Sequence, residues 1–456
     1  MTAYQTLNPT TGKVEKTFST HTDAEKARFL DVAQETYRSD WRRRSIAERC
    51  AVVSRAAAIL RRDLDRHAGL ITTEMGKLFT EARGEVEFTA QILEYYAREA
   101  EKFLAPQKLA VDSGKAVLLS QPLGIIYCIE PWNYPYYQLA RVAAPNLVAG
   151  NVVIAKHAPN VPQCAEAFAA LFPEAGGPQG IYTNVFLSND QSAELIADSR
   201  VRGVALTGSE RAGRAVAAQA GAALKKDTME LGGSDAFIVL EDADLDRALG
   251  CAVRGRMSNN GQVCTAAKRM IVHESVADTF IARLKEKVEA FRPGDPMAPE
   301  STHGPMSSEK QLDLTLSQIG EAVKGGATLV TGGERIRRDG FFMTAAILTG
   351  VTKDNPVYYQ EIFGPVATVY RVGSEREAID LANDSPYGLG GTVFTKDADR
   401  GYRIAEEIET GMVSVNANMA GSPALPFGGV KNSGYGRELS SLGIEEFLNK
   451  KLIRVA

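Results

Sequence analysis

One cysteine stands in a stretch that could place a reactive thiol at a turn. Residues 260–266 read Asn-Gly-Gln-Val-Cys-Thr-Ala after a segment with helical periodicity, so Cys264 follows a glycine-containing turn. A thiolate adds readily to a carbonyl carbon, the adduct can lose hydride, and the resulting thioester is easily hydrolysed. A lone cysteine is more often a small buried apolar side chain. Its neighbouring motifs must decide between these interpretations.

A second stretch could bind phosphate. Residues 206–213 read Leu-Thr-Gly-Ser-Glu-Arg-Ala-Gly, where an apolar strand-like run enters a helical segment through small residues. Unpaired N–H groups and the dipole at a helix N-terminus attract phosphate. This turn does not follow the Gly-x-Gly-x-x-Gly pattern, so an ordinary strand-to-helix connection is the competing interpretation.

The elements that must position these residues predict an α/β protein. Residues 24–37, 46–67 and 79–103 have helical periodicity, and residues 107–122 alternate like a hairpin arm that could pair with another subunit. From Asn151 short apolar runs (152–155, 184–187, 201–206) alternate with helical stretches, which predicts parallel strands and a doubly wound lobe. A second α/β lobe is expected from Phe237, with strands near 269–273, 367–371 and 412–416.

Composition and charge exclude several classes of protein. A chain of 456 residues is long enough for two or three lobes without disulfides or metals. The 52 basic and 56 acidic residues nearly balance and form no like-charge run, so no nucleic-acid partner is expected. The first residues do not resemble a leader, and the apolar runs are too short to cross a membrane. We therefore expect no membrane association and a cytoplasmic location.

The cysteines argue against a disulfide framework and against a metal site. The five cysteines form an odd, scattered set without a Cys-x-x-Cys pair, so reduced thiols are expected and no metal site is predicted. The cysteines are Cys50, Cys128, Cys164, Cys251 and Cys264.

Five ordered motifs resemble those of the aldehyde dehydrogenase superfamily. They are Pro-Trp-Asn-Tyr-Pro at 131–135, Glu-Leu-Gly-Gly at 230–233, Gly-Gln-Val-Cys at 261–264, Glu-Ile-Phe-Gly-Pro-Val at 361–366 and Pro-Phe-Gly-Gly-Val-Lys-Asn-Ser-Gly at 426–434. Asn-Pro-Thr-Thr-Gly at 8–12 resembles the usual opening of the family. Five motifs in the right order do not arise by chance.

The resemblance implies a catalytic role for three residues. Cys264 would be the nucleophile, and its backbone N–H with the Asn133 side chain would stabilise the oxyanion. Glu230 would be the general base that activates water against the thioester. Its apolar, glycine-rich context suits close packing more than an exposed helix face, and coenzyme A-acylating relatives usually lack this glutamate.

The resemblance also implies an NAD or NADP site. Gly208 and Ser209 would bind the pyrophosphate, Lys156 the adenine ribose, and Glu361 and Phe363 the nicotinamide ribose and its packing. The further expected cofactor contacts are Ile129, Trp132, His157, Pro159 and Leu231.

One departure bears on the choice of cofactor. The family commonly reads Lys-Pro-Ser-Glu where this chain has Lys-His-Ala-Pro at 156–159. Pro159 cannot accept the ribose hydrogen bonds of the missing glutamate, and it does not repel a 2′-phosphate. Lys156 with His157 could attract that phosphate, so use of both NAD and NADP is expected.

The leading substrate hypothesis is succinate semialdehyde. Arg141 lies where that branch of the superfamily carries an arginine for the distal carboxylate, and a guanidinium can pair with a carboxylate through two hydrogen bonds. Tyr137 would line the tunnel and Ser422 could supply a hydroxyl contact. Against this, Ser258 stands where several such enzymes have a second arginine. A surface role for Arg141 and a general aliphatic or aromatic aldehyde substrate are the alternatives.

The fold implied by the resemblance is α/β, with a Rossmann-like cofactor domain, an α/β catalytic domain and a small β oligomerisation element. We expect the cofactor domain at residues 1–105 and 123–231, the catalytic domain at 232–430, and the oligomerisation element at 106–122 and 431–456. A homodimer or homotetramer is expected. A coenzyme A-acylating enzyme and a catalytically silent homologue are the competing classes, and the presence of both Cys264 and Glu230 argues against them.

Overall fold

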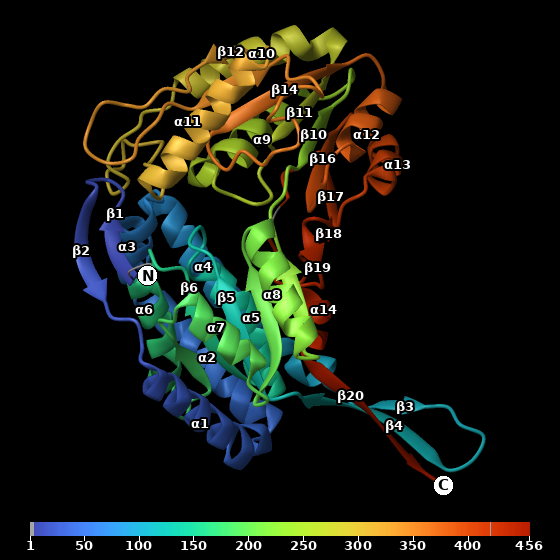
Figure 1. Ribbon diagram of the computed structural model, residues 1–456. Coiled ribbons are helices and arrows are strands. Elements are labelled where there is room, and N and C mark those ends of the chain that lie inside the picture. The colour runs from blue at the N-terminus through green and yellow to red at the C-terminus, as the bar shows by residue number, and fades with distance from the viewer. Residues whose placement is uncertain (1–3, 420) are drawn as a thin grey trace.

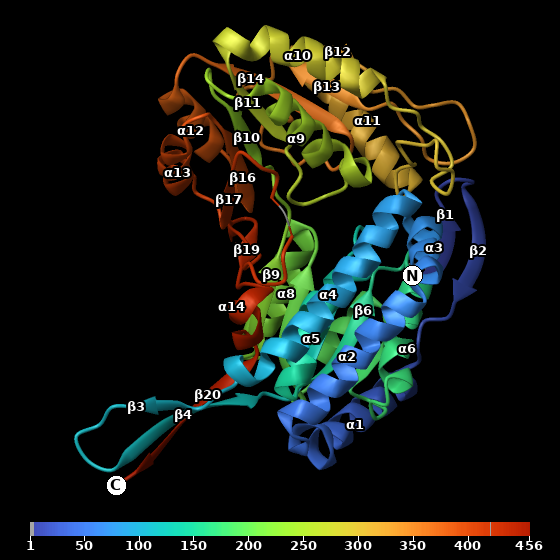
Figure 2. The ribbon, with the colours of Figure 1, turned by 180° about the vertical axis from the view of Figure 1, so that it is seen from behind.

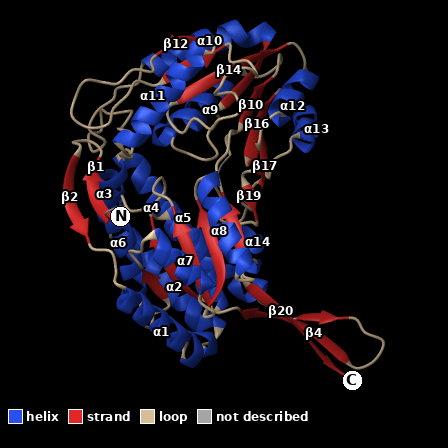
Figure 3. Cartoon of the chain, viewed as in Figure 1, coloured by secondary structure: helices blue, strands red, loops and turns tan. Residues whose placement is uncertain are grey.

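Each of two lobes is built on a mainly parallel sheet, and a three-stranded arm projects from the first lobe (Figure 1). The computed structural model describes residues 4–419 and 421–456. Helices cover the sheets on both sides, as expected for buried parallel strands (Figure 3). The α/β fold class expected from the sequence is confirmed.

The first lobe carries a six-stranded sheet in the order β19-β9-β8-β5-β6-β7. β5 to β9 are parallel, and β19 from the C-terminal part of the chain pairs antiparallel with β9. The strands are β5 (Ile125–Glu130), β6 (Val152–His157), β7 (Tyr182–Asn184), β8 (Val201–Thr207), β9 (Lys226–Glu230) and β19 (Gly434–Tyr435).

Helices from three parts of the chain surround this sheet. They are α1 (Asp23–Ser39), a 3₁₀ turn (Trp41–Arg43), α2 (Ile46–Arg62), α3 (Leu64–Met75), α4 (Phe79–Phe103), α5 (Tyr137–Ala149), α6 (Pro162–Glu174), α7 (Asn189–Ala197), α8 (Glu210–Ala222) and α14 (Ser440–Glu445). Capping boxes start α1, at Thr22 and Glu25, and α2, at Ser45 and Glu48. A hairpin of β1 (Tyr4–Asn8) and β2 (Lys13–Phe18) lies beside α3 and α6 (Figure 2).

Two element predictions were wrong in detail. The segment 46–67, predicted as one helix, is divided between α2 and α3, because the chain leaves helical geometry at Asp63 (φ −106°, ψ 25°). The predicted strand 184–187 lies earlier, at β7, and the chain beyond Asn184 leads directly to the capping box of α7 at Ser188.

The second lobe carries a seven-stranded sheet in the order β12-β13-β14-β11-β10-β16-β17, parallel except for β12 against β13. Alternate side chains of β10 enter two different cores: Phe237 and Val239 pack on one face, and Ala236 and Ile238 on the other. The strands are β10 (Ala236–Val239), β11 (Arg269–His273), β12 (Thr328–Thr331), β13 (Ala346–Thr349), β14 (Val366–Val372), β16 (Gly390–Phe394) and β17 (Met412–Val415). The helices are α9 (Leu245–Met257), α10 (Glu274–Glu289), α11 (Glu309–Lys324), α12 (Glu375–Asn383) and α13 (Ala398–Glu407), and a small sheet joins β15 (Tyr387–Gly388) to β18 (Val430–Lys431).

The projecting arm consists of β3 (Gln107–Leu109), β4 (Lys115–Pro122) and β20 (Leu448–Val455) in the order β20-β4-β3. The predicted hairpin is therefore present, and the last strand of the chain pairs with it over eight residues (Figure 1). Between β18 and β20, β19 and α14 contact the first lobe instead of the arm. Within residues 4–419 and 421–456, no helix is both long and apolar enough to cross a bilayer.

Candidate active site

The turn before Cys264 depends on left-handed backbone. α9 ends at Met257, and the following 3₁₀ turn (Ser258–Gly261) contains Asn259 at φ 51°, Asn260 at φ 54° and Gly261 at φ 69°. Asparagine and glycine are the residues that adopt this region at low cost. The sequence Asn-Asn-Gly therefore lets the chain reverse sharply before the thiol.

Buried amides hold this turn in place. The side chain of Asn260 donates to the carbonyls of Gly304 and Pro305, both at 2.6 Å, and the amide oxygen of Gln262 accepts from the N–H of Ser307 at 2.9 Å. Asn259 donates to the carbonyl of Asn133 at 2.9 Å. The turn is thereby fixed to both lobes.

Arg256 connects the turn before Cys264 to the segment 361–366, which is predicted to contact the nicotinamide ribose. Its buried guanidinium donates to the carbonyls of Val366 (2.6 Å), Gly261 (3.1 Å) and Ile362 (2.9 Å), and also to that of Gly364. Burial lowers the pKa of Arg256 to about 9. Sequence reasoning missed this residue, because nothing in its local pattern distinguishes it from a surface arginine of a helix.

Cys264 opens into a cavity of about 940 Å³ that both lobes line. Burial raises the pKa of its thiol to about 11, and the positive charges of Arg141 and Lys268 partly oppose that rise. The backbone N–H of Cys264 donates no hydrogen bond to any described residue. A thiol and a free N–H are thus available at one point of the cavity.

Asn133 lies against the same turn. Its Nδ2 donates to the carbonyl of Gln262 at 2.9 Å, which uses one of its two N–H bonds. The second N–H is available to a further acceptor. The structure therefore brings the predicted nucleophile and the predicted amide donor together.

A buried ion pair supports the segment of Asn133. Lys77 and Glu85 pair with side chains about 1% exposed, and Lys77 Nζ donates to the carbonyl of Asn133 at 2.9 Å. Glu85 also accepts from the backbone N–H of Tyr136 at 2.9 Å. Lys77, between α3 and α4, and Glu85, on α4, were not singled out from the sequence, since their partner segment is about 50 residues away along the chain.

Glu230 lies at the end of β9 and is not among the residues that line the cavity of Cys264. Both carboxylate oxygens are buried without a hydrogen-bond partner among the described residues. Burial, followed by the nearby Glu438, raises the pKa of Glu230 well above its ordinary value. Its backbone carbonyl accepts from the N–H of Gly208 at 2.9 Å, which joins it to the predicted phosphate turn.

The predicted phosphate turn has the form expected of it. Gly208 connects β8 to α8, and Ser209 caps α8 by accepting from the N–H of Ala212 at 3.3 Å. Leu231 packs so closely on α8 that a Cβ at Gly213 would overlap its side chain. The helix N-terminus is therefore held directly beside β9, the strand that carries Glu230.

Other predicted cofactor residues lie around this turn. Ile129 and Lys156 are paired neighbours on β5 and β6, and Trp132 meets Phe363 edge to face with ring centroids 5.8 Å apart. Lys156 Nζ makes no hydrogen bond or ion pair within the described residues, and burial lowers its pKa. The carbonyl of Pro159 accepts from the N–H of Gln5.

The expectation that His157 helps to attract a 2′-phosphate is corrected. His157 is fully buried, and its ring nitrogens lie 3.1 Å from the carbonyl of Glu130 and 2.9 Å from that of Pro135. Burial lowers its pKa to about 4, so the ring is neutral near pH 7. Both residues are buried on β6, but only the side chain of Lys156 is left without a hydrogen-bond partner among the described residues, so Lys156 is the cation of this pair.

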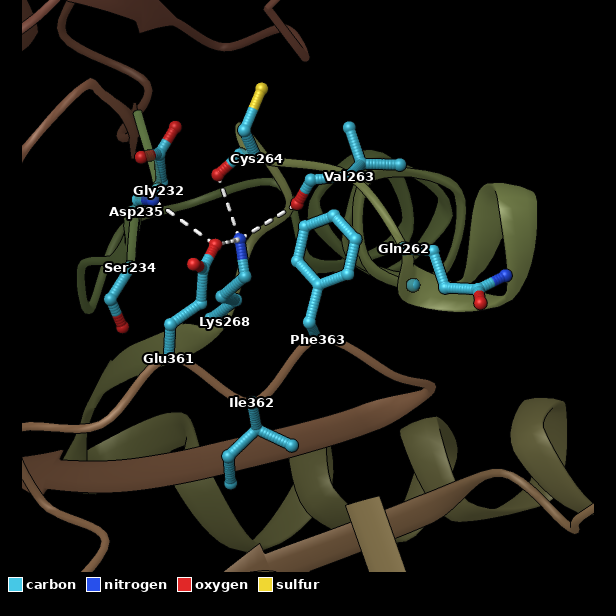
Figure 4. A network of polar contacts seen from close by, with 12 residues as sticks. Gly232, Ser234, Asp235, Gln262, Val263, Cys264, Lys268, Glu361, Ile362 and Phe363 are labelled. Carbon is cyan, nitrogen blue, oxygen red and sulfur yellow. Dashed lines mark hydrogen bonds and ion pairs between the residues drawn. The ribbon is translucent and has the colours of Figure 1, made fainter. Parts of the chain in front are cut away.

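Lys268 connects the cysteine loop to the predicted nicotinamide-ribose residue (Figure 4). Its ammonium donates to the carbonyls of Val263 and Cys264, both at 2.7 Å, and pairs with Glu361 at 3.1 Å. Glu361 also accepts from the N–H of Gly233 at 3.1 Å. Sequence reasoning did not single out Lys268.

The three predicted substrate residues all line the cavity of Cys264. They are Arg141, Tyr137 and Ser422. The guanidinium of Arg141 lies 4.6 Å from the ring centroids of both Tyr137 and Phe427, and its Nε is 2.7 Å from Oε2 of Glu438. Arg141 is thus a wall residue whose charge already has a counter-charge, which sequence reasoning did not anticipate.

This geometry defines a class of enzyme. A thiol with an unused backbone N–H lies in a cavity between two α/β lobes, and the first lobe carries a helix N-terminus suited to phosphate next to β9. This is the arrangement of a cysteine-dependent, dinucleotide-binding oxidoreductase. The sequence model of the aldehyde dehydrogenase family matches residues 1–453, and the chain belongs to that family.

Relatives and solved structures resemble the chain over its full length. A succinate-semialdehyde dehydrogenase (NADP+) of Deinococcus radiodurans is 50% identical over 451 residues, covering 99% of this chain and 94% of the relative. The structure of Gox0499 is 66% identical with a TM-score of 0.99 over all of both chains. The succinic semialdehyde dehydrogenase of Streptococcus pyogenes, solved with NADP+, is 49% identical with a TM-score of 0.98, covering 99% of this chain and all of that one.

Proposed function

We propose that the chain oxidises succinate semialdehyde to succinate with NAD or NADP, through a thiohemiacetal and then a thioester on Cys264. The observation that carries this proposal is that the Cys264 thiol and two unpaired cations, Arg247 and Arg254, line the same cavity. The relatives named as succinate-semialdehyde dehydrogenases support the same substrate.

The charges of the cavity wall favour an anionic aldehyde. Lys77 is paired with Glu85, Arg141 with Glu438, and Asp246 with Arg283. Burial raises the pKa values of Glu81 and Asp235, and nearby positive charges oppose this rise: Lys77 acts on Glu81, and Lys268 and Arg269 act on Asp235. Two cations of α9 complete the charged lining, Arg247 and Arg254, and neither has a side-chain partner among the described residues. A substrate carboxylate in the cavity therefore meets the positive charges of Arg247 and Arg254, which no carboxylate of the described residues pairs with.

Cys264 and Asn133 perform the first part of the reaction. The Cys264 thiol loses its proton to water in the cavity, and the thiolate sulfur adds to the aldehyde carbon. The oxygen that becomes negative accepts from the Cys264 N–H and the second Nδ2–H of Asn133. Each preorganised donor of this kind contributes about 2.7–4 kcal/mol to stabilising the transition state.

The residues around β8 and α8 fit a dinucleotide. Gly208 and Ser209 would hold the pyrophosphate at the helix N-terminus, Lys156 the adenine side, and Glu361 with Phe363 the nicotinamide ribose. Ile129, Trp132, Pro159 and Leu231 would complete the contacts. When bound, the dinucleotide accepts the hydride that the tetrahedral adduct loses. The unpaired ammonium of Lys156 supports binding of NADP as well as NAD.

Glu230 would then act as the general base that activates water to hydrolyse the thioester. A raised carboxyl pKa suits this role, because a base works best when its pKa lies near the working pH. Since Glu230 is not in the wall that contains Cys264, its side chain must approach the sulfur through rotation or through a water molecule.

The arm supports proposals about assembly and domains. β3, β4 and β20 project away from the body, and Leu109, Leu452, Ile453 and Val455 are exposed on them. We propose that the arm pairs with another copy of the chain in a homodimer or homotetramer. We also propose the domain division expected from the sequence, except that β19 and α14 belong to the first lobe and only β20 of the segment 431–456 belongs to the arm. All five cysteines are free, which supports a reducing, cytoplasmic location.

Steady-state rates over a panel of aldehydes test the substrate. Succinate semialdehyde should exceed a neutral aldehyde of similar length in kcat/KM, and the product without coenzyme A should be the free acid. Cys264→Ala should abolish nicotinamide reduction, and Glu230→Gln should leave a burst of one equivalent followed by slow turnover. Equal efficiency with the neutral aldehyde would instead indicate a general aldehyde dehydrogenase. Activity that survives in Cys264→Ala would overturn the mechanism.

A further inference from the structure

The ammonium of Lys268 has as many acceptors as it has protons. Three N–H bonds meet the carbonyl of Val263, the carbonyl of Cys264 and Oε1 of Glu361, and the side chain is 3% exposed. A buried ammonium is costly unless it is paired and fully hydrogen bonded. The three acceptors use all three N–H bonds of the Lys268 ammonium, so all three partners determine its position.

The carboxylate of Glu361 is anchored through one oxygen. Oε1 accepts from Lys268 and from the N–H of Gly233, whereas Oε2 accepts no hydrogen bond from the described residues. A Cβ at Gly232 would overlap Oε2, so only glycine allows this approach. One oxygen is therefore fixed and the other is left for a ligand hydroxyl.

The ammonium acts on Cys264 through the main chain. Two of its three bonds are to the carbonyls of residues 263 and 264, while the sulfur points away from the ammonium (Figure 4). The same group thus fixes the backbone that carries the nucleophile and the carboxylate expected to bind the nicotinamide ribose.

We propose that Lys268 is a positioning residue that assembles the Cys264 turn and the carboxylate of Glu361 as one unit, so that the nucleophile and the nicotinamide side of the dinucleotide are held in register. The inference deepens the proposed function and depends on it for the role of Glu361. A purely structural lysine would stabilise the fold without coupling these two properties.

The test uses the whole protein with Lys268→Met, Glu361→Gln and the double variant. Two quantities are measured: the dissociation constant of NADPH from its fluorescence, and the rate of alkylation of Cys264 by iodoacetamide in the free protein. Lys225→Met is the matched control, because Lys225 also donates to two backbone carbonyls, of Ile196 and Asp198, outside the site.

Lys268→Met should weaken NADPH binding by about 10- to 100-fold, the range for loss of a charged hydrogen bond, and should also slow alkylation. Glu361→Gln should weaken NADPH binding while leaving alkylation within about twofold, and the double variant should bind NADPH no more weakly than the weaker single variant. Lys268→Gln, whose amide keeps part of the donor set, should lie between wild type and Lys268→Met and is the second variant if the methionine protein does not fold.

Additive losses of NADPH binding, or unchanged alkylation in the folded Lys268 variants, would overturn the coupling. Failure of the proposed function is recognised separately, because it would appear in the wild-type protein as absent NADPH binding or absent aldehyde oxidation.

Discussion

Arg141, which lines the cavity that contains Cys264, forms an ion pair with Glu438, with Nε 2.7 Å from Oε2. Both residues are buried, and Glu438 opposes the desolvation that would lower the pKa of Arg141. A substrate carboxylate that approaches Arg141 therefore meets a guanidinium that is already paired. Arg141 therefore has a structural role in this ion pair, which can be measured separately from any contact with the substrate.

Arg141→Met should destabilise the protein by about 3–5 kcal/mol, because it leaves Glu438 buried without its counter-charge. The double variant Arg141→Met with Glu438→Gln should lose less stability than the single one. Urea denaturation measures both. If the two substitutions add, the pair does not carry this stability.

Removing the uncompensated charge of Arg254 should weaken capture of an anionic aldehyde. Arg254→Gln should raise KM for succinate semialdehyde about fivefold, which corresponds to about 1 kcal/mol of Coulomb energy in water, with kcat unchanged. The effect should shrink as salt is raised, since the screening length is only about 8 Å at 0.15 M.

Two comparisons control this experiment. The KM for a neutral aldehyde should not change in Arg254→Gln. Arg403→Gln on α13 makes the same change in net charge at an exposed residue outside the cavity, so it should behave like wild type. A similar rise of KM in Arg403→Gln would show that the effect is one of total charge.

Lys156, rather than His157, should determine affinity for the 2′-phosphate. Lys156→Met should reduce the preference for NADP over NAD by about 10- to 100-fold, since a charge-assisted contact is lost. His157→Asn should leave that ratio unchanged, because the ring is buried and neutral. Measured kcat/KM values with both cofactors decide this. A wild-type preference for NAD above about 10³-fold, or about 4 kcal/mol, would contradict dual use.

The raised pKa of Cys264 predicts a steep pH dependence in the free protein. Only the thiolate reacts, so the alkylation rate should rise about tenfold per pH unit from neutral pH and level off near the thiol pKa of about 11. The Cys264→Ala protein is the control, since the other four cysteines are buried. A plateau already reached below pH 8 would show that the positive charges of Arg141 and Lys268 outweigh burial.

Local patterns predicted the elements well where packing and turn chemistry agreed. α4 has the bounds expected from its periodicity, and the alternation of short apolar runs with helices correctly indicated parallel strands. The break between α2 and α3 was missed because Asp63 interrupts a continuous helical pattern without glycine or proline.

The sequence by itself determined the family and the α/β class, and it predicted the thiol, amide and carboxylate of the site, because these follow from motifs of adjacent residues. Only the tertiary structure decided how their charges are compensated. Arg141 meets Glu438 almost 300 residues later in the chain, and Lys268 meets Glu361 about 90 residues later. The ring of His157 lies against two backbone carbonyls, while Lys156 beside it has no such partner among the described residues. Charge pairing depends on distances of a few ångströms between remote segments, and a linear pattern carries no such distances.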